Sequence, residues 1–171
     1  MQSKSPLKLL FKFSLALASC LLIWGCSAVS VLAPIDEKLS NGIVRFYEDG
    51  NHLKTRVYLT NLTPLNTYSL RIHSVGDCRD PLKGSIGQPF DHTTHNLQRD
   101  TVERQEIGSL GTLTADENGS IKSQFMILGS KLSGPRGESI LGRSLILVAR
   151  GQNEITGQPI ACGLISKNST L

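Results

Sequence analysis

Histidine is scarce in this sequence, and several common catalytic motifs are missing from it. The 171 residues include four histidines, which limits the metal sites that imidazole ligands could build. No GxSxG, HExxH or phosphate-loop pattern occurs, so there is no signature of a serine hydrolase, a zinc protease or a P-loop NTPase. The four cysteines never stand in a CxxC spacing, which excludes that redox centre.

A sustained helical period is also lacking, since no ten-residue stretch keeps one. Short segments of strand character separated by glycine-containing turns predict an all-β sandwich or barrel instead. Some of these segments alternate apolar and polar residues, whereas residues 144–149 are apolar throughout and are typical of a strand buried on both faces. The expected strands are residues 42–48, 52–62, 67–73, 120–128, 144–149 and 159–165, with 28–32 as a possible first strand.

Two long segments have no strand character, residues 76–106 and residues 129–142. Structureless stretches of this length are uncommon in a compact domain and are often functional loops. We therefore expect any site to lie near one of them.

The N-terminus resembles an export signal. Lys4, Lys8 and Lys12 precede an apolar run, residues 13–25, that is short for a membrane-spanning helix, which needs about 20 residues. We interpret residues 1–25 as a lipoprotein-type signal peptide; a retained membrane anchor is the alternative.

The segment "LIWGC" resembles a bacterial lipobox, which predicts Cys26 as the lipidated first residue of the mature chain. Cys20 in "LASC" also fits the pattern, but its use would leave "LLIWG" at the mature N-terminus. Residues 26–41 would then be a tether with a possible first strand, and residues 42–171 the folded domain.

Charge gives little reason to expect a nucleic-acid partner. Three of the 18 basic residues and none of the 14 acidic ones lie in the leader, leaving 15 against 14 in the mature chain. Nucleic-acid binding needs lysine and arginine clustered on one face, and no such cluster is visible along the sequence.

Cys78 and Cys162 remain after the leader cysteines are assigned. In an exported protein two remaining cysteines are expected to pair, although two free thiols are the alternative. Closing this 84-residue separation would stabilise the fold by about 4 to 5 kcal/mol on the chain-entropy account.

Four segments in order, "YSLRIHSVGDC", "IGSLGTLTADENG", "GESILGRSLILVA" and "ACGLI", resemble the Cu/Zn superoxide dismutase family over about residues 42–165. The resemblance implies an eight-stranded Greek-key β-barrel or sandwich. It also places Cys78 and Cys162 where the family has its disulfide.

The resemblance implies a copper site whose ligands are mostly replaced. Of the four expected copper histidines, His73 is present, while Arg71, Pro89 and Val148 stand at the other three positions. The active-site arginine position holds Pro159. Proline and valine cannot ligate a metal, and the Arg71 cation repels one.

The implied zinc site is equally altered, with Glu106 and Ser109 at a histidine and an aspartate position and the third histidine near His95 or Leu97. We expect no catalytic residues and no bound copper or zinc, and hence a non-catalytic scaffold or binding module. The alternative is a zinc or copper protein with residual dismutase or metal-carrier activity. It would use His73, His92 and His95 with Glu106 or Asp91.

The leader and the resemblance together predict the location and the partners. Ser27 after the lipobox cysteine resembles the pattern for sorting to the outer membrane, so we expect a lipid-anchored protein of the bacterial envelope that faces the periplasm. Its partners would be the membrane, through the anchor, and a protein of the envelope whose identity the sequence does not give.

Overall fold

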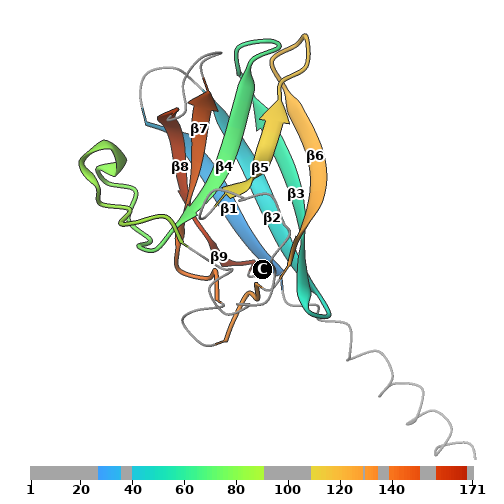
Figure 1. Cartoon of the computed structure of the whole chain (residues 1–171), viewed down its shortest axis with the longest axis vertical. Helices are drawn as coiled ribbons and strands as arrows, with labels where there is room; N and C mark the ends of the chain where they lie inside the picture. Colours follow the sequence, from blue (N-terminus) through green and yellow to red (C-terminus); the bar gives the residue numbers. More distant parts are fainter. Residues whose placement is uncertain are drawn as a thin grey trace, which may run out of the picture.

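The computed structural model describes residues 27–35, 40–90, 109–128, 130–134, 139–150 and 157–168. These residues form strands joined by turns and one short 3-10 helix (Figure 1). The elements are β1 (Ser27–Pro34), β2 (Asn41–Asp49), β3 (His52–Thr60), β4 (Thr67–His73), η1 (Pro81–Lys83), β5 (Ser109–Thr114), β6 (Ile121–Leu128), β7 (Ser144–Arg150), β8 (Gln158–Leu164) and β9 (Ser166–Lys167).

The strands form one antiparallel sheet that curls into a nearly closed barrel. Its hydrogen-bonded order is β5-β4-β7-β8-β1-β2-β3-β6, and β9 pairs with β1 beside this path. Chain neighbours β3 and β4, and likewise β6 and β7, lie far apart in this order, so their connections cross an end of the barrel as in a Greek key. The expected all-β, eight-stranded Greek-key barrel is thus confirmed, with β9 as an addition.

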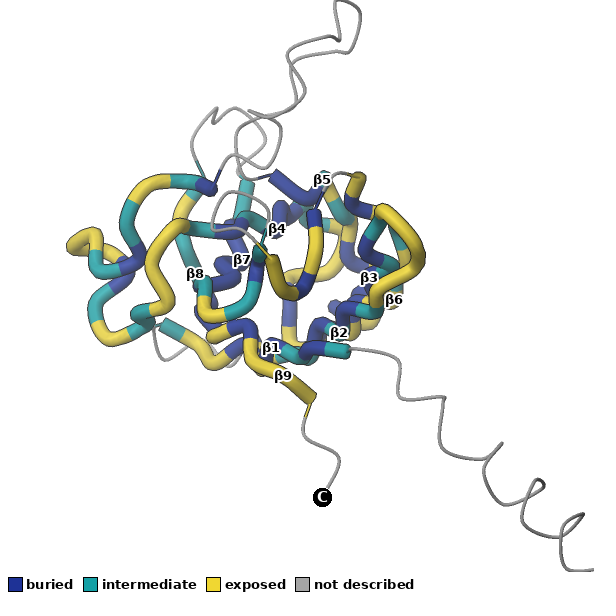
Figure 2. The backbone as a smooth tube through the Cα atoms, turned by 90° about the horizontal axis from the view of Figure 1, so that it is seen from below, coloured by how far each residue is buried: buried dark blue, intermediate teal, exposed yellow. Residues whose placement is uncertain are grey.

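The hairpin of β2 and β3 shows how the sequence pattern produces the barrel wall. Gly50 takes a φ of 61° in the turn, which glycine adopts without steric cost. Beyond it Leu53, Val57 and Leu59 are buried, and Arg56 and Tyr58 are exposed. The tube in Figure 2 shows buried and exposed positions around the barrel wall. Period-two alternation along β3 therefore places one face in the core.

Strand β7 is buried on both faces, as its apolar sequence predicted. Leu145 and Leu147 join the main core inside the barrel. Ile146 and Val148 join a second, smaller apolar cluster outside it. Another segment must therefore cover the outer face of β7, and Ile86 of the loop after β4 belongs to this cover.

Several elements were not anticipated from the sequence. Strand β5 was missed because it is short and its Gly111 interrupts the pattern, with a φ of 119°. Strand β9, with two residues, is too short to show a period. The possible first strand at residues 28–32, in contrast, is present as β1 and lies in the middle of the sheet between β2 and β8.

We expect Gly119→Ala to destabilise the fold through the turn between β5 and β6. Gly119 has a φ of 69°, and a β-carbon there would collide with the carbonyl oxygen of Leu62. Strain and collision together should lower the free energy of unfolding by about 2 to 4 kcal/mol, measured by urea titration. The control is Gly50→Ala, with a similar φ of 61° and open space around the position, which should cost about 1 kcal/mol. Equal losses in the two variants would contradict the collision.

Candidate functional site

The outer face of β4 carries two of the four positions at which the resemblance implies copper ligands. Arg71 and His73 are both half-buried and lie on the same face, opposite Ile146 and Ser144 of β7. On its other side β4 pairs with β5, where Ser109 lies opposite Arg71. The two residues are therefore close to each other on the surface that β5 and β7 flank.

The end of the loop after β4 folds back onto that strand. The amide of Ser74 donates to the carbonyl of Gln88 at 2.8 Å, and that of Phe90 donates to Ile72 at 2.9 Å. Pro89 consequently forms a β-bridge with His73. The loop end brings Pro89 next to the histidine.

Val148 lies in the apolar cluster that covers the outer face of β7. It is 3% exposed and packs with Ile86, Ile146 and Cys162, with Ile35 and Cys78 at the rim. On β4 its partner is Ser69, two residues from Arg71, and on β8 its partner is Pro159. Arg71, His73, Pro89, Val148, Pro159 and Ser109 are thus neighbours on one outer face.

The His73 ring is anchored by the loop. Its Nδ1 lies 3.0 Å from the carbonyl oxygen of Gly87, a distance at which an Nδ1–H would donate. Burial lowers the pKa of His73 below 6.5, and the Arg71 charge adds to this, against the opposing effect of the Gly87 hydrogen bond. A neutral ring with its proton on Nδ1 keeps the lone pair on Nε2.

Arg143 supports the same region and was not singled out from the sequence. Its Nε donates to the carbonyl of Ser139 at 2.7 Å, and its Nη1 donates to that of Ser74 at 3.1 Å. The guanidinium lies 3.6 Å from the ring centroid of Phe90, a cation–π contact. It therefore ties the turn after β4 to the start of β7, a role that no motif in the sequence indicates.

Comparison with known proteins agrees with this arrangement. Residues 40–165 match the family described as copper/zinc superoxide dismutase (SODC). The chain belongs to this family. It is 30% identical over 125 residues to "Superoxide dismutase [Cu-Zn]" of Paramecium bursaria Chlorella virus 1, covering 72% of this chain and 62% of that protein's length. It is also 30% identical over 119 residues to "Superoxide dismutase [Cu-Zn]" of Saccharomyces cerevisiae, covering 67% and 73% of the two chains.

The dismutase fold therefore places the expected copper positions together but with different chemistry. The buried side chain of Val148 sits among apolar groups, and Pro89 offers no donor atom beside His73. Arg71 adds a positive charge where a cation would bind. The described residues at these positions do not fit a copper ion, because His73 alone among them can donate to one.

The zinc candidates fall largely outside the described residues. These are Asp91, His92, His95, Leu97 and Glu106. Within the described part of the chain no three His, Cys, Asp or Glu side chains group to hold a metal. In those same residues no helix has the length and apolarity to cross a membrane. A zinc site made with His92 and His95 thus stays a hypothesis.

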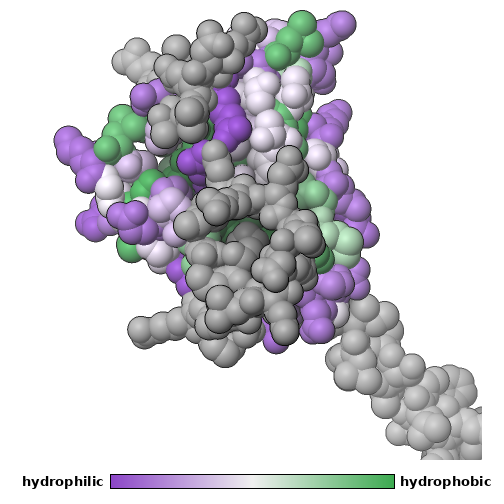
Figure 3. Space-filling view, viewed as in Figure 1, coloured by the Kyte–Doolittle hydropathy of each residue, from purple (hydrophilic) through white to green (hydrophobic). Residues whose placement is uncertain are grey.

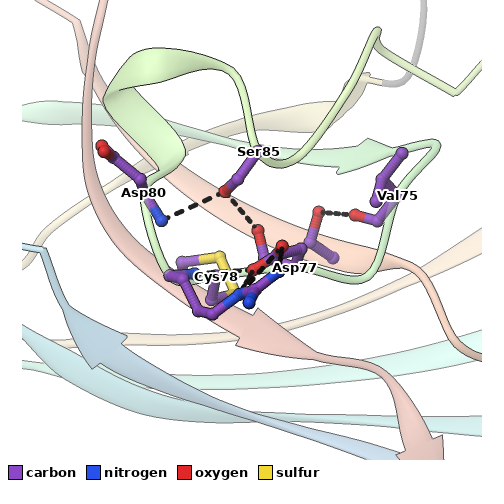
Figure 4. The surroundings of a disulfide bond; sticks show 8 residues. Val75, Asp77, Cys78, Asp80 and Ser85 are labelled. Carbon is purple, nitrogen blue, oxygen red and sulfur yellow. Dashed lines mark hydrogen bonds and ion pairs between the residues drawn. A yellow bond between two sulfur atoms is a disulfide. The ribbon is translucent and has the colours of Figure 1, made fainter.

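The expected disulfide is present and pins the loop to the barrel. Cys78 and Cys162 are bonded, with their Cα atoms 5.8 Å apart and a sequence separation of 84. Around Cys78, Ser85 Oγ donates to the carbonyl of Asp77 at 2.7 Å and accepts from the amide of Asp80 at 3.1 Å (Figure 4). Hydrogen bonds from Arg79 hold the pKa of Asp77 at about 2. Residues 76–90 are therefore a compact loop, with hydrophilic side chains at its tip on the left of Figure 3.

We expect the double variant Cys78→Ala/Cys162→Ala to fold but to melt well below wild type. Loss of a native bridge typically costs about 2 to 5 kcal/mol, which corresponds to roughly 5 to 15 °C for a chain of this size. Calorimetry of the oxidised wild type and the variant measures the difference. The wild type reduced with dithiothreitol should match the variant. Two titratable thiols in folded, oxidised wild type would contradict the assignment.

Proposed function

We propose that this member of the copper/zinc superoxide dismutase family is a non-catalytic binding module of the cell envelope, held at the membrane by a lipid on Cys26. The observation that carries the proposal is Val148, an apolar side chain packed with Ile86, Ile146 and Cys162 where the resemblance expects a copper histidine. An imidazole at this position would place a polar ring in an apolar cluster. Valine in place of histidine therefore suits the packing around it.

Arg71 supports the same proposal. A guanidinium carries its charge at any physiological pH and presents donors but no acceptor. Placed beside His73 on β4, it favours anions over cations on this face. The barrel that remains is a rigid scaffold, with its loops and outer faces available for partners.

We expect the protein purified without added metal to hold much less than one copper per chain and to show no dismutase activity above a metal-free control. Metal content by plasma mass spectrometry and a cytochrome c reduction assay measure the two quantities. The yeast relative, prepared in parallel, is the positive control. One copper per chain retained after dialysis, with activity that depends on it, would contradict the proposal.

Membrane attachment through Cys26 is tested separately. Cys26→Ser should move the protein to the soluble fraction in high-salt buffer, because the acyl anchor is lost while the barrel buries its core. Cys20→Ser is the matched control and should leave the protein with the membrane. A Cys26→Ser protein that stays membrane-bound with its leader removed would reject this residue as the anchor.

A metal carrier is the second candidate, and the ring orientation of His73 favours it. With Nδ1 turned to Gly87, Nε2 is left on the side away from that carbonyl. One imidazole cannot build a zinc site, which needs three or four ligands. His92 and His95 on the following segment would have to complete it.

We expect His92→Ala/His95→Ala to leave the melting temperature nearly unchanged, with or without added zinc. Arg71 opposes a cation beside His73, and ordering a segment to reach it would cost roughly 1 to 2 kcal/mol for each residue fixed. Thermal denaturation with and without zinc measures this. A melting temperature that rises with zinc in wild type, but not in the double variant, would favour the metal carrier instead.

A further inference from the structure

The outer face of β1, β2, β3 and β6 carries several basic side chains. They are neighbours in the sheet but are not consecutive in the sequence. Cross-strand register places Arg45 opposite Arg56, and Lys54 next to Tyr47. Lys122 of β6 lies opposite Tyr58 of β3. We call the surface of Arg45, Lys54, Arg56 and Lys122 the basic face. The expectation that lysine and arginine are not clustered on one face is therefore wrong.

Acid is nearly absent from this surface. Among the described outward positions of these four strands the single acid is Asp49, at the turn end of β2. Glu48, the next residue, points to the other side of the sheet, where its Oε1 accepts from the amide of Leu132 at 2.9 Å. The charges of the four cations therefore add up to a positive electrostatic potential over this surface.

The position of Arg45 opposite Arg56 lowers the stability of the sheet. Like charges directly opposite each other on neighbouring strands destabilise a sheet. The guanidinium of Arg56 lies 5.3 Å from the ring centroid of Tyr47, which only partly offsets that repulsion. A polar uncharged residue at either position would suit the fold better, so the charge is better explained by an anionic partner.

The place where the chain enters the barrel indicates which anion. Ser27, the first residue of β1, lies in the same row as Tyr47 and Lys54. The apolar run of residues 13–25 and Cys26 come directly before it. From the spacing of strands and residues in a sheet, Arg45 is about 7 Å along the sheet from that row, and Lys122 about 13 Å along it and about 14 Å across it from Ser27. An anchor before Ser27 would hold the basic face within reach of the lipid.

Exposed apolar and aromatic residues are interleaved with the cations. Val31, Tyr58 and Met126 are 62%, 46% and 52% exposed on the same outer face. Tyrosine is favoured at a lipid headgroup layer, because its ring and hydroxyl suit the two sides of that layer. We propose that the basic face binds anionic phospholipid headgroups and lays the barrel on its side against the membrane. The proposal rests on the membrane attachment proposed above and adds the face and the lipid class.

The test uses the full-length chain purified in mild detergent and inserted into vesicles of phosphatidylcholine, alone or mixed with phosphatidylglycerol. An amine-acylating reagent followed by mass spectrometry reports the reaction rate of each lysine. We expect Lys54 and Lys122 to react about fivefold more slowly with phosphatidylglycerol present, the factor expected for one cation at an anionic surface. High salt should restore their rates. Lys83, on the loop at the opposite side of the barrel (Figure 1), should react equally in both.

A matched pair of double variants tests the residues. Arg45→Gln/Arg56→Gln should abolish the protection of Lys54 and Lys122, yet melt at or above the wild-type temperature because the like-charge pair is gone. Arg79→Gln/Lys83→Gln removes the same charge from the opposite side and should keep the protection. A first double variant that loses protection and also melts lower would count against the proposal, because misfolding would then explain the loss.

The remaining outcomes are also decisive. Flotation with neutral vesicles tests the anchor alone; a chain that floats only with anionic vesicles still supports the basic face, and one that floats with neither rejects it. Equal lysine rates in both vesicles reject the basic face while leaving the anchor intact. Protection already present in detergent would mean that a second copy covers the face. Equal protection by added DNA in detergent would make it a general polyanion site. Either result overturns the assignment to lipid.

Discussion

The attachment of residues 76–90 to the outer face of the barrel is the constraint on which the candidate site depends. The disulfide fixes the start of this loop to β8. Near its end, the carbonyls of Ile86 and Gln88 accept from amides just after β4, and the amide of Phe90 donates to Ile72 of β4. Between these points Ile86 covers Ile146 and Val148. Without this cover two apolar side chains of β7 would face water. The loop is thus held by a disulfide, by hydrogen bonds and by apolar contacts together.

The site illustrates how a family backbone can be kept while its chemistry changes. Register, bridge and disulfide still place residues 71, 73, 89, 148 and 159 side by side. Arg71 and Val148 replace donors by a cation, which lies opposite Ser109 of β5, and by an apolar group, which packs in the apolar cluster. A site of this kind can be identified by geometry, but its activity has to be argued from its side chains.

Much of the barrel could be predicted because its signals are local. Alternation in residues 52–60, the apolar run at 144–149 and the Asp-Gly turn each determine an element within a few residues. The pairing of Cys78 with Cys162 followed from a count. Strand β5 was missed because it is short and Gly111 interrupts its pattern. The supporting role of Arg143 was missed because it depends on contact with a segment distant in sequence. The basic face was missed for the same reason, since Arg45 and Arg56 become neighbours only through the register of β2 and β3.

The central place of β1 has a consequence for the order in which the protein can assemble. The strand that enters the barrel first along the chain pairs with β8 and β9, which come last. In a chain that emerges from its N-terminus first, β1 can pair with β2 at once but lacks its second partner strand until β8 has followed. The same pairing delays barrel closure, since contacts between distant residues form slowly. Such a chain would stay open enough to be threaded through a narrow channel and would close only after its last strands arrive.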